Sequence, residues 1–192
     1  MSDQTVQNTS ERAALGASQL SSCLGRVDAG QLDALEDAIV AADRVFVMGA
    51  GRSLLMLRAF AMRLMHLGFT AYVVGDTTTP AFGEGDLLVC GSGSGTTSSV
   101  VNVAKKAKDL GGTVACFTIK VESPLGQLSD CVVTIPAYTD KESYEGMEKP
   151  VLPGGSEFES SILLLGDAMV VPLGEKRNIP TDQAFRLHAN LE

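Results

Sequence analysis

LLVCGSGSGTTSS, at residues 87–99, is the stretch from which the fold can be predicted. Its first four residues form a short apolar run, rich in aliphatic side chains, of the kind typical of a buried parallel strand. Alternating glycine and serine then end the run, and VVNVAKKA at residues 100–107 has the apolar spacing of a helix. The stretch therefore predicts a strand, a tight turn and the start of a helix.

The turn between this strand and this helix has the composition of a phosphate-binding loop. Glycines let the backbone approach a ligand closely, and the new helix begins with free N–H groups that attract anions. No Lys follows Gly95, so the loop lacks the group that a Walker A loop offers to a nucleotide, and it favours a monophosphate. A plain connecting turn is the alternative. The residues of this candidate socket are Ser92, Gly93, Ser94, Thr96 and Thr97.

Composition limits the class of protein. A chain of 192 residues, 45% hydrophobic and 20% charged, is typical of one globular domain with a sizeable core. A net charge of -8 argues against a nucleic-acid partner, because such binding depends on cationic contacts. The four cysteines show no CxxC spacing, so we expect reduced thiols, no metal site and a cytoplasmic location. The N-terminus has no signal-peptide pattern, and the apolar run at residues 162–173 is too short to span a membrane.

Strands and helices are expected to alternate along most of the chain. Helices at residues 5–24 and 28–42 form a helical lead-in over residues 1–43. A sheet core over residues 44–136 holds strands at 44–48, 70–74, 87–90, 113–118 and 131–135, with helices at 54–66, from about 100 to about 111, and at 124–128. Residues 137–192 contain a polar loop to 152, for which a lid is the alternative, a helix at 155–171 and a short helix in the tail at 181–192. This pattern predicts a single domain with a parallel sheet covered on both faces, and ligands that bind beyond the carboxyl ends of its strands.

A dinucleotide-binding site is an alternative function for this edge of the sheet. Gly49 and Gly51 follow the first strand, and Asp76 follows the second, where a ribose-binding acid is expected. Leu54 occupies the place of the third glycine, however, and that glycine is what permits close helix packing over a pyrophosphate. The pattern therefore favours the phosphate socket.

Several stretches of the chain form a pattern when they are taken together. They are GAGRS at 49–53, SGSGTT at 92–97, AFAMRLMHLG at 59–68, VNVAKKAK at 101–108, FE at 158–159 and HANLE at 188–192. With these stretches the chain resembles the sugar isomerase (SIS) domain family and, within it, the 6-phospho-3-hexuloisomerases. The resemblance extends from about residue 29 to the end, and it is weakest over residues 137–152. One position departs from the pattern, because relatives often carry Glu where this chain has Thr96.

The resemblance implies an α/β fold of the flavodoxin-like kind, a three-layer sandwich with a five-stranded parallel sheet and helices on both faces. It implies a homo-oligomer, a tetramer with sites at subunit interfaces, and a phosphorylated hexulose as substrate. The implied reaction interconverts D-arabino-3-hexulose 6-phosphate and fructose 6-phosphate, after formaldehyde has been condensed with ribulose 5-phosphate. An enediol isomerisation of this kind needs one carboxylate and no metal or redox cofactor. Neither nucleic acid nor a membrane is an expected partner.

The resemblance also implies roles for individual residues. Glu159 is the catalytic base and His188 assists it. The phosphate is held by Ser92, Ser94 and Thr97, with Gly93 and Thr96 in the same loop, while Gly51, Arg52 and Ser53 face the sugar.

Each of these residues has a structural alternative. Glu159 can favour the dipole of a helix N-terminus, Arg52 can pair with a carboxylate, and His188 can be a surface residue of the tail. Residues two apart on a helix point to different sides, so only one of Glu157 and Glu159 can face the site.

Two other functions remain open. A sugar-phosphate sensor keeps the socket without the base, although such regulators usually add a DNA-binding segment that this chain lacks. An isomerase for a different phosphosugar is the other possibility.

Overall fold

Five parallel strands form one sheet in the order β2-β1-β3-β4-β5 in the computed structural model, which describes residues 8–139, 149–179, 188 and 190. This order is the flavodoxin-like one, in which the chain reverses its direction of winding between β1 and β3. The predicted flavodoxin-like α/β fold is confirmed. The strands are β1 (Arg44–Gly49), β2 (Ala71–Val73), β3 (Asp86–Gly91), β4 (Thr113–Thr118) and β5 (Cys131–Thr134).

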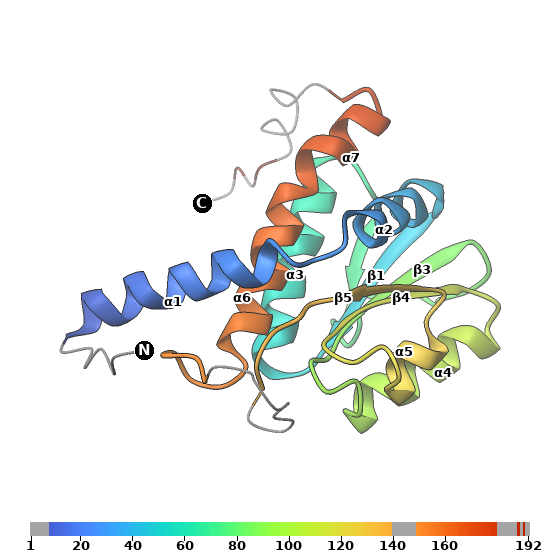
Figure 1. The fold of residues 1–192 in the computed structure, drawn as a ribbon. Helices are drawn as coiled ribbons and strands as arrows, with labels where there is room; N and C mark the ends of the chain where they lie inside the picture. Colours follow the sequence, from blue (N-terminus) through green and yellow to red (C-terminus); the bar gives the residue numbers. More distant parts are fainter. Residues whose placement is uncertain (1–7, 140–148, 180–187, 189, 191–192) are drawn as a thin grey trace.

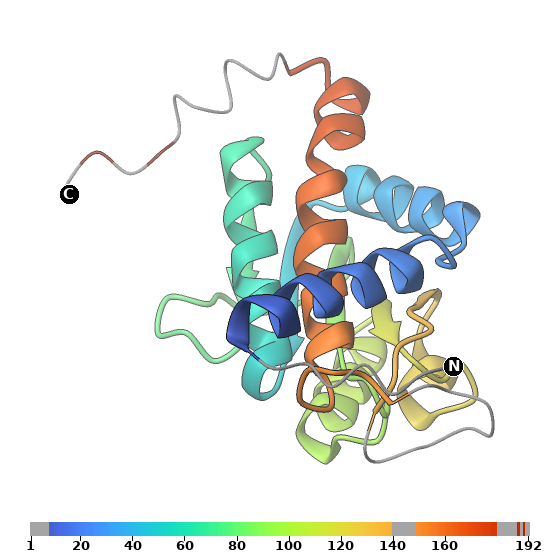
Figure 2. The ribbon, with the colours of Figure 1, turned by 60° about the vertical axis from the view of Figure 1, so that its left-hand side comes forward.

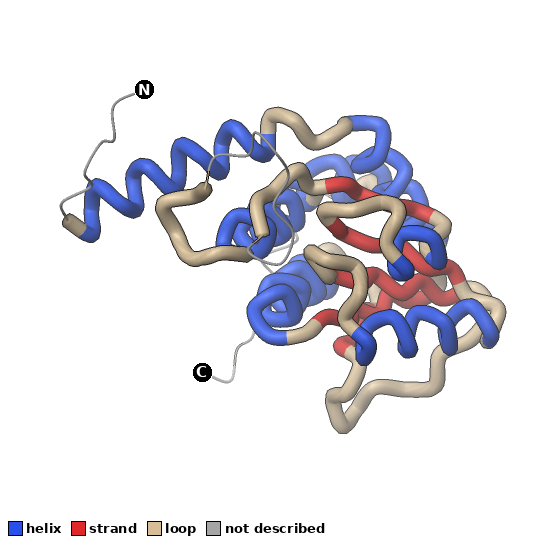
Figure 3. The backbone as a smooth tube through the Cα atoms, turned by 60° about the horizontal axis from the view of Figure 1, so that its bottom comes forward, coloured by secondary structure: helices blue, strands red, loops and turns tan. Residues whose placement is uncertain are grey.

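Helices cover both faces of the sheet, as Figures 1 and 3 show. On one face lie α2 (Ala29–Ala41), α3 (Gly51–His66) and α6 (Ser156–Ala168), with α7 (Val170–Lys176) following α6. On the other face lie α4 (Ser98–Asp109) and the short α5 (Pro124–Leu128). The first helix, α1 (Thr9–Leu24), crosses α6 and extends past the sheet (Figures 1 and 2).

Alternating side chains of the strands divide the core between these two faces. Val45 and Val47 of β1 pack with the helices around α3, whereas Phe46 packs with α4. Successive strand residues point to opposite faces of a sheet, so a central strand covered on both sides must be apolar throughout. All six residues of β3 are buried accordingly.

Two helices differ from the prediction. The helix expected from residue 54 begins at Gly51, so Arg52 and Ser53 belong to its first turn. The helix expected at 155–171 is divided at Met169 into α6 and α7, and it ends at Lys176. Pro172 lacks the N–H that would bond to the carbonyl four residues earlier, which explains the break just before it.

Other parts of the prediction fall outside the described residues. The tail helix at 181–192 is one of them, apart from His188 and Asn190, and residues 140–148 of the polar loop are another. In the described part of the chain, no helix is both long and apolar enough to cross a membrane.

Candidate active site

A cleft of about 440 Å³ opens at the carboxyl ends of β1 and β3. The chain reverses its winding between these two strands, and ligands of flavodoxin-like sheets bind at that point. The walls come from the start of α3, the loop between β3 and α4, the start of α6, and single residues after β4 and β5. The lining residues are Ala50, Gly51, Arg52, Ser53, Gly91, Ser92, Gly93, Ser94, Thr97, Ile119, Thr139, Gly154, Gly155, Phe158 and Glu159.

The loop between β3 and α4 is fixed by its neighbours. The N–H of Ile119 donates to the carbonyl of Gly93 over 3.0 Å, and the N–H of Leu125 donates to the carbonyl of Gly95 over 3.0 Å. Gly95 has a φ of +62°, a conformation that favours glycine. Bonds from the next βα unit therefore hold the loop in one shape before any ligand arrives.

Hydroxyl groups of this loop lie at the N-terminus of α4. The Oγ of Ser92 and the Oγ1 of Thr97 are 3.0 Å apart, and the Oγ1 of Thr96 donates to the Oγ of Ser94 over 2.9 Å. Thr97 is the N-cap of α4 but makes no side-chain capping bond. The first N–H groups of α4 thus lack a side-chain cap, and such a helix N-terminus suits an anion.

Glu159 reaches the cleft from the first turn of α6. Gly155, the residue before this helix, has a φ of +91°, which turns the chain into α6 at the edge of the cleft. The Nε of Arg52 donates to the Oε2 of Glu159, so an ion pair joins the N-terminal ends of α3 and α6. The arginine is 62% exposed and the glutamate 16% exposed. The alternative in which Arg52 pairs with a carboxylate is thus the arrangement found here.

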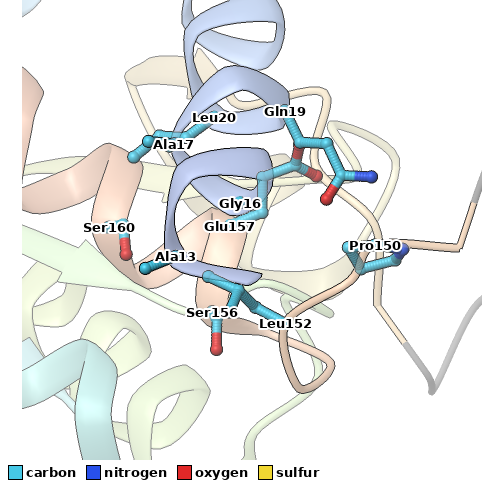
Figure 4. A pocket seen from close by; sticks show the side chains of 10 residues that line it. All are labelled: Ala13, Gly16, Ala17, Gln19, Leu20, Pro150, Leu152, Ser156, Glu157 and Ser160. Carbon is cyan, nitrogen blue, oxygen red and sulfur yellow. The ribbon is translucent and has the colours of Figure 1, made fainter. Parts of the chain in front are cut away.

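Glu157 and Glu159 point to different sides of α6, as the helical spacing predicts. The Oε2 of Glu157 accepts a hydrogen bond of 2.8 Å from the N–H of Tyr138. Figure 4 shows Glu157 in a separate groove between α1 and α6, which Gln19 and Leu152 also line. Glu159 alone of the two lines the cleft.

The structure brings together most of the residues predicted for the site. Two of them lie elsewhere: Thr96 is outside the lining, and His188 stacks on His66, with ring centroids 4.0 Å apart. His66 ends α3, and its helix rises about 20 Å from the cleft to that point. Within one chain, His188 is therefore not at the cleft. The residues gathered there are Gly51, Arg52, Ser53, Ser92, Gly93, Ser94, Thr97 and Glu159.

The imidazole of His66 is buried against the end of α3. Burial lowers its pKa, and the neighbouring His188 and Arg63 lower it further. Its Nδ1 makes no hydrogen bond with the described residues. His66 is therefore a packed residue at the end of α3.

Sequence reasoning missed the apolar wall of the cleft. Ile119 and Phe158 line it without having been assigned to it, and the polar Thr139 also lines the cleft. Ile119 directly follows β4, so the rule that carboxyl strand ends share one edge could have found it.

Comparisons with known proteins match this sequence and fold. The model of the SIS domain family matches residues 38–147. A curated protein of Bacillus subtilis (strain 168), named 3-hexulose-6-phosphate isomerase, is 42% identical over 96% of this chain and 99% of its own length. A protein of the same name from Mycobacterium gastri is 46% identical over 87% of this chain and 83% of its own length.

A solved structure supports the same relationship. It is a hypothetical protein from Methanococcus jannaschii, for which a molecular function of 3-hexulose-6-phosphate isomerase is inferred. The TM-score is 0.79 at 33% identity, and the alignment covers 95% of this chain and 99% of that one. Because the family model spans more than half of the chain and these relatives align over nearly all of it, this chain belongs to the SIS domain family, among the 3-hexulose-6-phosphate isomerases, also called 6-phospho-3-hexuloisomerases.

Proposed function

We propose that this protein interconverts D-arabino-3-hexulose 6-phosphate and fructose 6-phosphate through an enediol. One observation carries the proposal: among the described residues, Glu159 is the one carboxylate that shares a cleft with an uncapped helix N-terminus surrounded by hydroxyls. The first group can move a proton between adjacent carbons, and the second can hold a phosphate. The names of the Bacillus subtilis and Mycobacterium gastri relatives select this substrate pair among phosphosugars.

The phosphate would lie against the loop between β3 and α4. The free N–H groups at the start of α4 and the hydroxyls of Ser92, Ser94 and Thr97 offer donors to its oxygens. The loop lacks the Lys that binding of a nucleoside triphosphate requires, so we expect it to bind a single phosphate group. The hydroxyls of Ser92 and Thr97 are already 3.0 Å apart, which concentrates donors at one place.

Glu159 would act as the base on the sugar. From the 3-hexulose it takes the proton on C2, the electrons of that C–H bond form the C2–C3 double bond, and the C3 carbonyl oxygen becomes an enediolate oxygen. Return of a proton to C3, with loss of the proton on the C2 oxygen, gives the 2-ketose. One carboxylate on one face of the sugar can perform both transfers, since it carries the proton between them.

The test compares two glutamates of the same helix turn. Glu159→Gln keeps the size of the side chain and removes the proton acceptor, so turnover should fall at least ~100-fold while binding of fructose 6-phosphate is largely retained. Glu157→Gln, whose side chain faces the groove with α1, should stay active. Turnover is followed by NMR in deuterated water, where the native protein should place deuterium at C3 of fructose 6-phosphate.

The two rival functions give different results in this experiment. A sensor binds fructose 6-phosphate but leaves both its carbon-bound protons and its carbonyl position unchanged. An isomerase for another sugar forms a product other than the 3-hexulose. If the Glu159→Gln variant still exchanges the sugar proton with deuterated water at the native rate, the base is a different residue.

We further propose that a second copy of the chain completes the site. Leu55 and Met62 are 56% and 48% exposed, and they lie seven residues apart, so both are on one face of α3. Antiparallel pairing of this face with its copy would set Leu55 against the partner's Met62. The partner's His188, stacked on the C-terminal end of the partner's α3, would then approach the cleft, which is at the N-terminal end of α3.

Mixing two inactive variants tests this arrangement. A Glu159→Gln subunit and a His188→Ala subunit, combined by unfolding and refolding together, should form hybrid sites with both groups intact. Recovered activity is the expected result, because one site then receives its imidazole from the other chain. No recovery, or a fully active monomer in light scattering, contradicts the proposal.

A further inference from the structure

The ion pair in the cleft joins two side chains that differ in freedom to move. Nε of Arg52 donates to Oε2 of Glu159, and the arginine is far more exposed than the glutamate. Ion pairs with an exposed partner contribute little to the free energy of folding, because water screens the charges and holding a long side chain in place costs entropy. A stronger anion can therefore take Arg52 away from Glu159.

We propose that Arg52 exchanges partners when the substrate binds. Its guanidinium releases the carboxylate of Glu159 and binds the phosphate of the substrate instead, so that phosphate binding frees the base. This inference rests on the function proposed above. The oxygen of Glu159 that accepts the guanidinium N–H is directed at Arg52, and it is available to a proton on carbon most directly once that bond is released. A phosphate dianion has more charge and more acceptor oxygens than a carboxylate, and arginine binds it with two N–H donors.

The position of Arg52 beside the phosphate loop makes this exchange possible. Gly49 at the end of β1 and Gly91 at the end of β3 are register partners, and neighbouring strands lie about 4.8 Å apart. Arg52 follows Gly49 by three residues, and Ser94 follows Gly91 by three. The two turns therefore lie side by side on one edge of the sheet, and an arginine side chain is long enough to reach from one to the other.

The charges around the cleft favour the same exchange. Among the described residues that line it, Arg52 is the only cation and Glu159 the only anion. An incoming dianion is attracted by Arg52 and repelled by Glu159, so it separates the pair. Arg52 is then a specificity determinant: a sugar without phosphate leaves the base engaged and reacts slowly even when it is bound.

The experiment supplies the substrate in two pieces. Unphosphorylated fructose is incubated with the protein in deuterated water, with or without phosphite dianion, and NMR measures deuterium at C3. Phosphite should accelerate exchange by the native protein at least ~10-fold, because it draws Arg52 from Glu159. In Arg52→Ala, exchange into fructose without phosphite should exceed the native rate at least ~10-fold, and phosphite should add little.

Controls separate this exchange of partners from simpler effects. Arg58→Ala removes an arginine of the same helix that pairs with Asp76 outside the cleft lining, and it should behave like the native protein. Arg52→Lys keeps the charge and should retain part of the phosphite effect. With fructose 6-phosphate, Arg52→Ala should raise KM and leave kcat within a few-fold of native.

Two results would overturn the inference. One is exchange into fructose that is no faster in Arg52→Ala than in the native protein, which means that Arg52 does not restrain the base. The other is a large loss of kcat on fructose 6-phosphate in Arg52→Ala, which would make Arg52 part of the chemistry. If the native protein itself places no deuterium at C3 of fructose 6-phosphate, the proposed function has failed, whatever the Arg52 variants do.

Discussion

Gly95 is the position at which the loop between β3 and α4 tolerates least change, and Gly95→Ala tests that reasoning. Its φ of +62° is in the left-handed region, where a residue with a Cβ loses about 1–2 kcal/mol. An added Cβ would also lie 1.9 Å from the Oγ and 2.5 Å from the Cβ of Ser123, which is buried. Overpacking of this kind costs about 1–3 kcal/mol, so the free energy of unfolding should fall by about 2–5 kcal/mol in total.

Chemical denaturation measures this loss against a matched control. Gly68 also has a positive φ, of +76°, but an added Cβ there meets nothing within 4 Å. Gly68→Ala should therefore lose only the backbone part, about 1–2 kcal/mol. The double variant Gly95→Ala with Ser123→Gly removes the clashing side chain and should recover about 1–3 kcal/mol relative to Gly95→Ala.

The comparison can refute the reasoning in two ways. If Gly95→Ala is no less stable than Gly68→Ala, the contact with Ser123 carries no energy. If the second substitution at Ser123 lowers stability further instead of restoring it, the lost bond from the Gly126 N–H to the Ser123 Oγ matters more than the clash. The loop would then be held by the cap of α5 and not by close packing.

Three further predictions concern binding and pH. Ser94→Ala and Thr97→Val should each weaken fructose 6-phosphate binding by about 1.5–3 kcal/mol in calorimetry, because each removes a donor to a charged group, and unchanged Kd values would contradict this. Burial lowers the pKa of His66 from its usual 6.5, so the unfolded chain takes up the proton first and the free energy of unfolding should decrease as pH falls below about 6.5. His66→Gln should reduce that decrease in denaturation curves taken at several pH values. Burial raises the pKa of the Cys116 thiol from 9.0 to about 11, so this thiol ionises in the unfolded chain before it does in the folded protein. The free energy of unfolding should therefore fall as pH rises from 9.0 towards 11, and denaturation curves should show a smaller fall for Cys116→Val.

Local patterns in the sequence were enough to predict the sheet and the turn between β3 and α4. The aliphatic run at residues 87–90 and the glycine-rich turn after it are neighbours in the chain, so their geometry depends mainly on nearby residues. The same holds for the two glutamates at the start of α6, because the helical period alone sends Glu157 and Glu159 to different sides. The helix break before Pro172 is a local effect too, and it escaped the prediction only because the apolar run continues through it.

Contacts between distant segments depended on the tertiary structure. Arg52 and Glu159 are 107 residues apart, and the sequence leaves open whether the arginine meets a carboxylate or the sugar. The stacking of His188 on His66 likewise joins the tail to the end of α3, away from the cleft for which His188 was predicted. The sequence by itself determined which elements form and, to within a few residues, where most of them begin and end, because those features follow from backbone conformation and periodicity. The tertiary structure decided which of those ends meet, because that depends on how β1, β3 and α6 pack together.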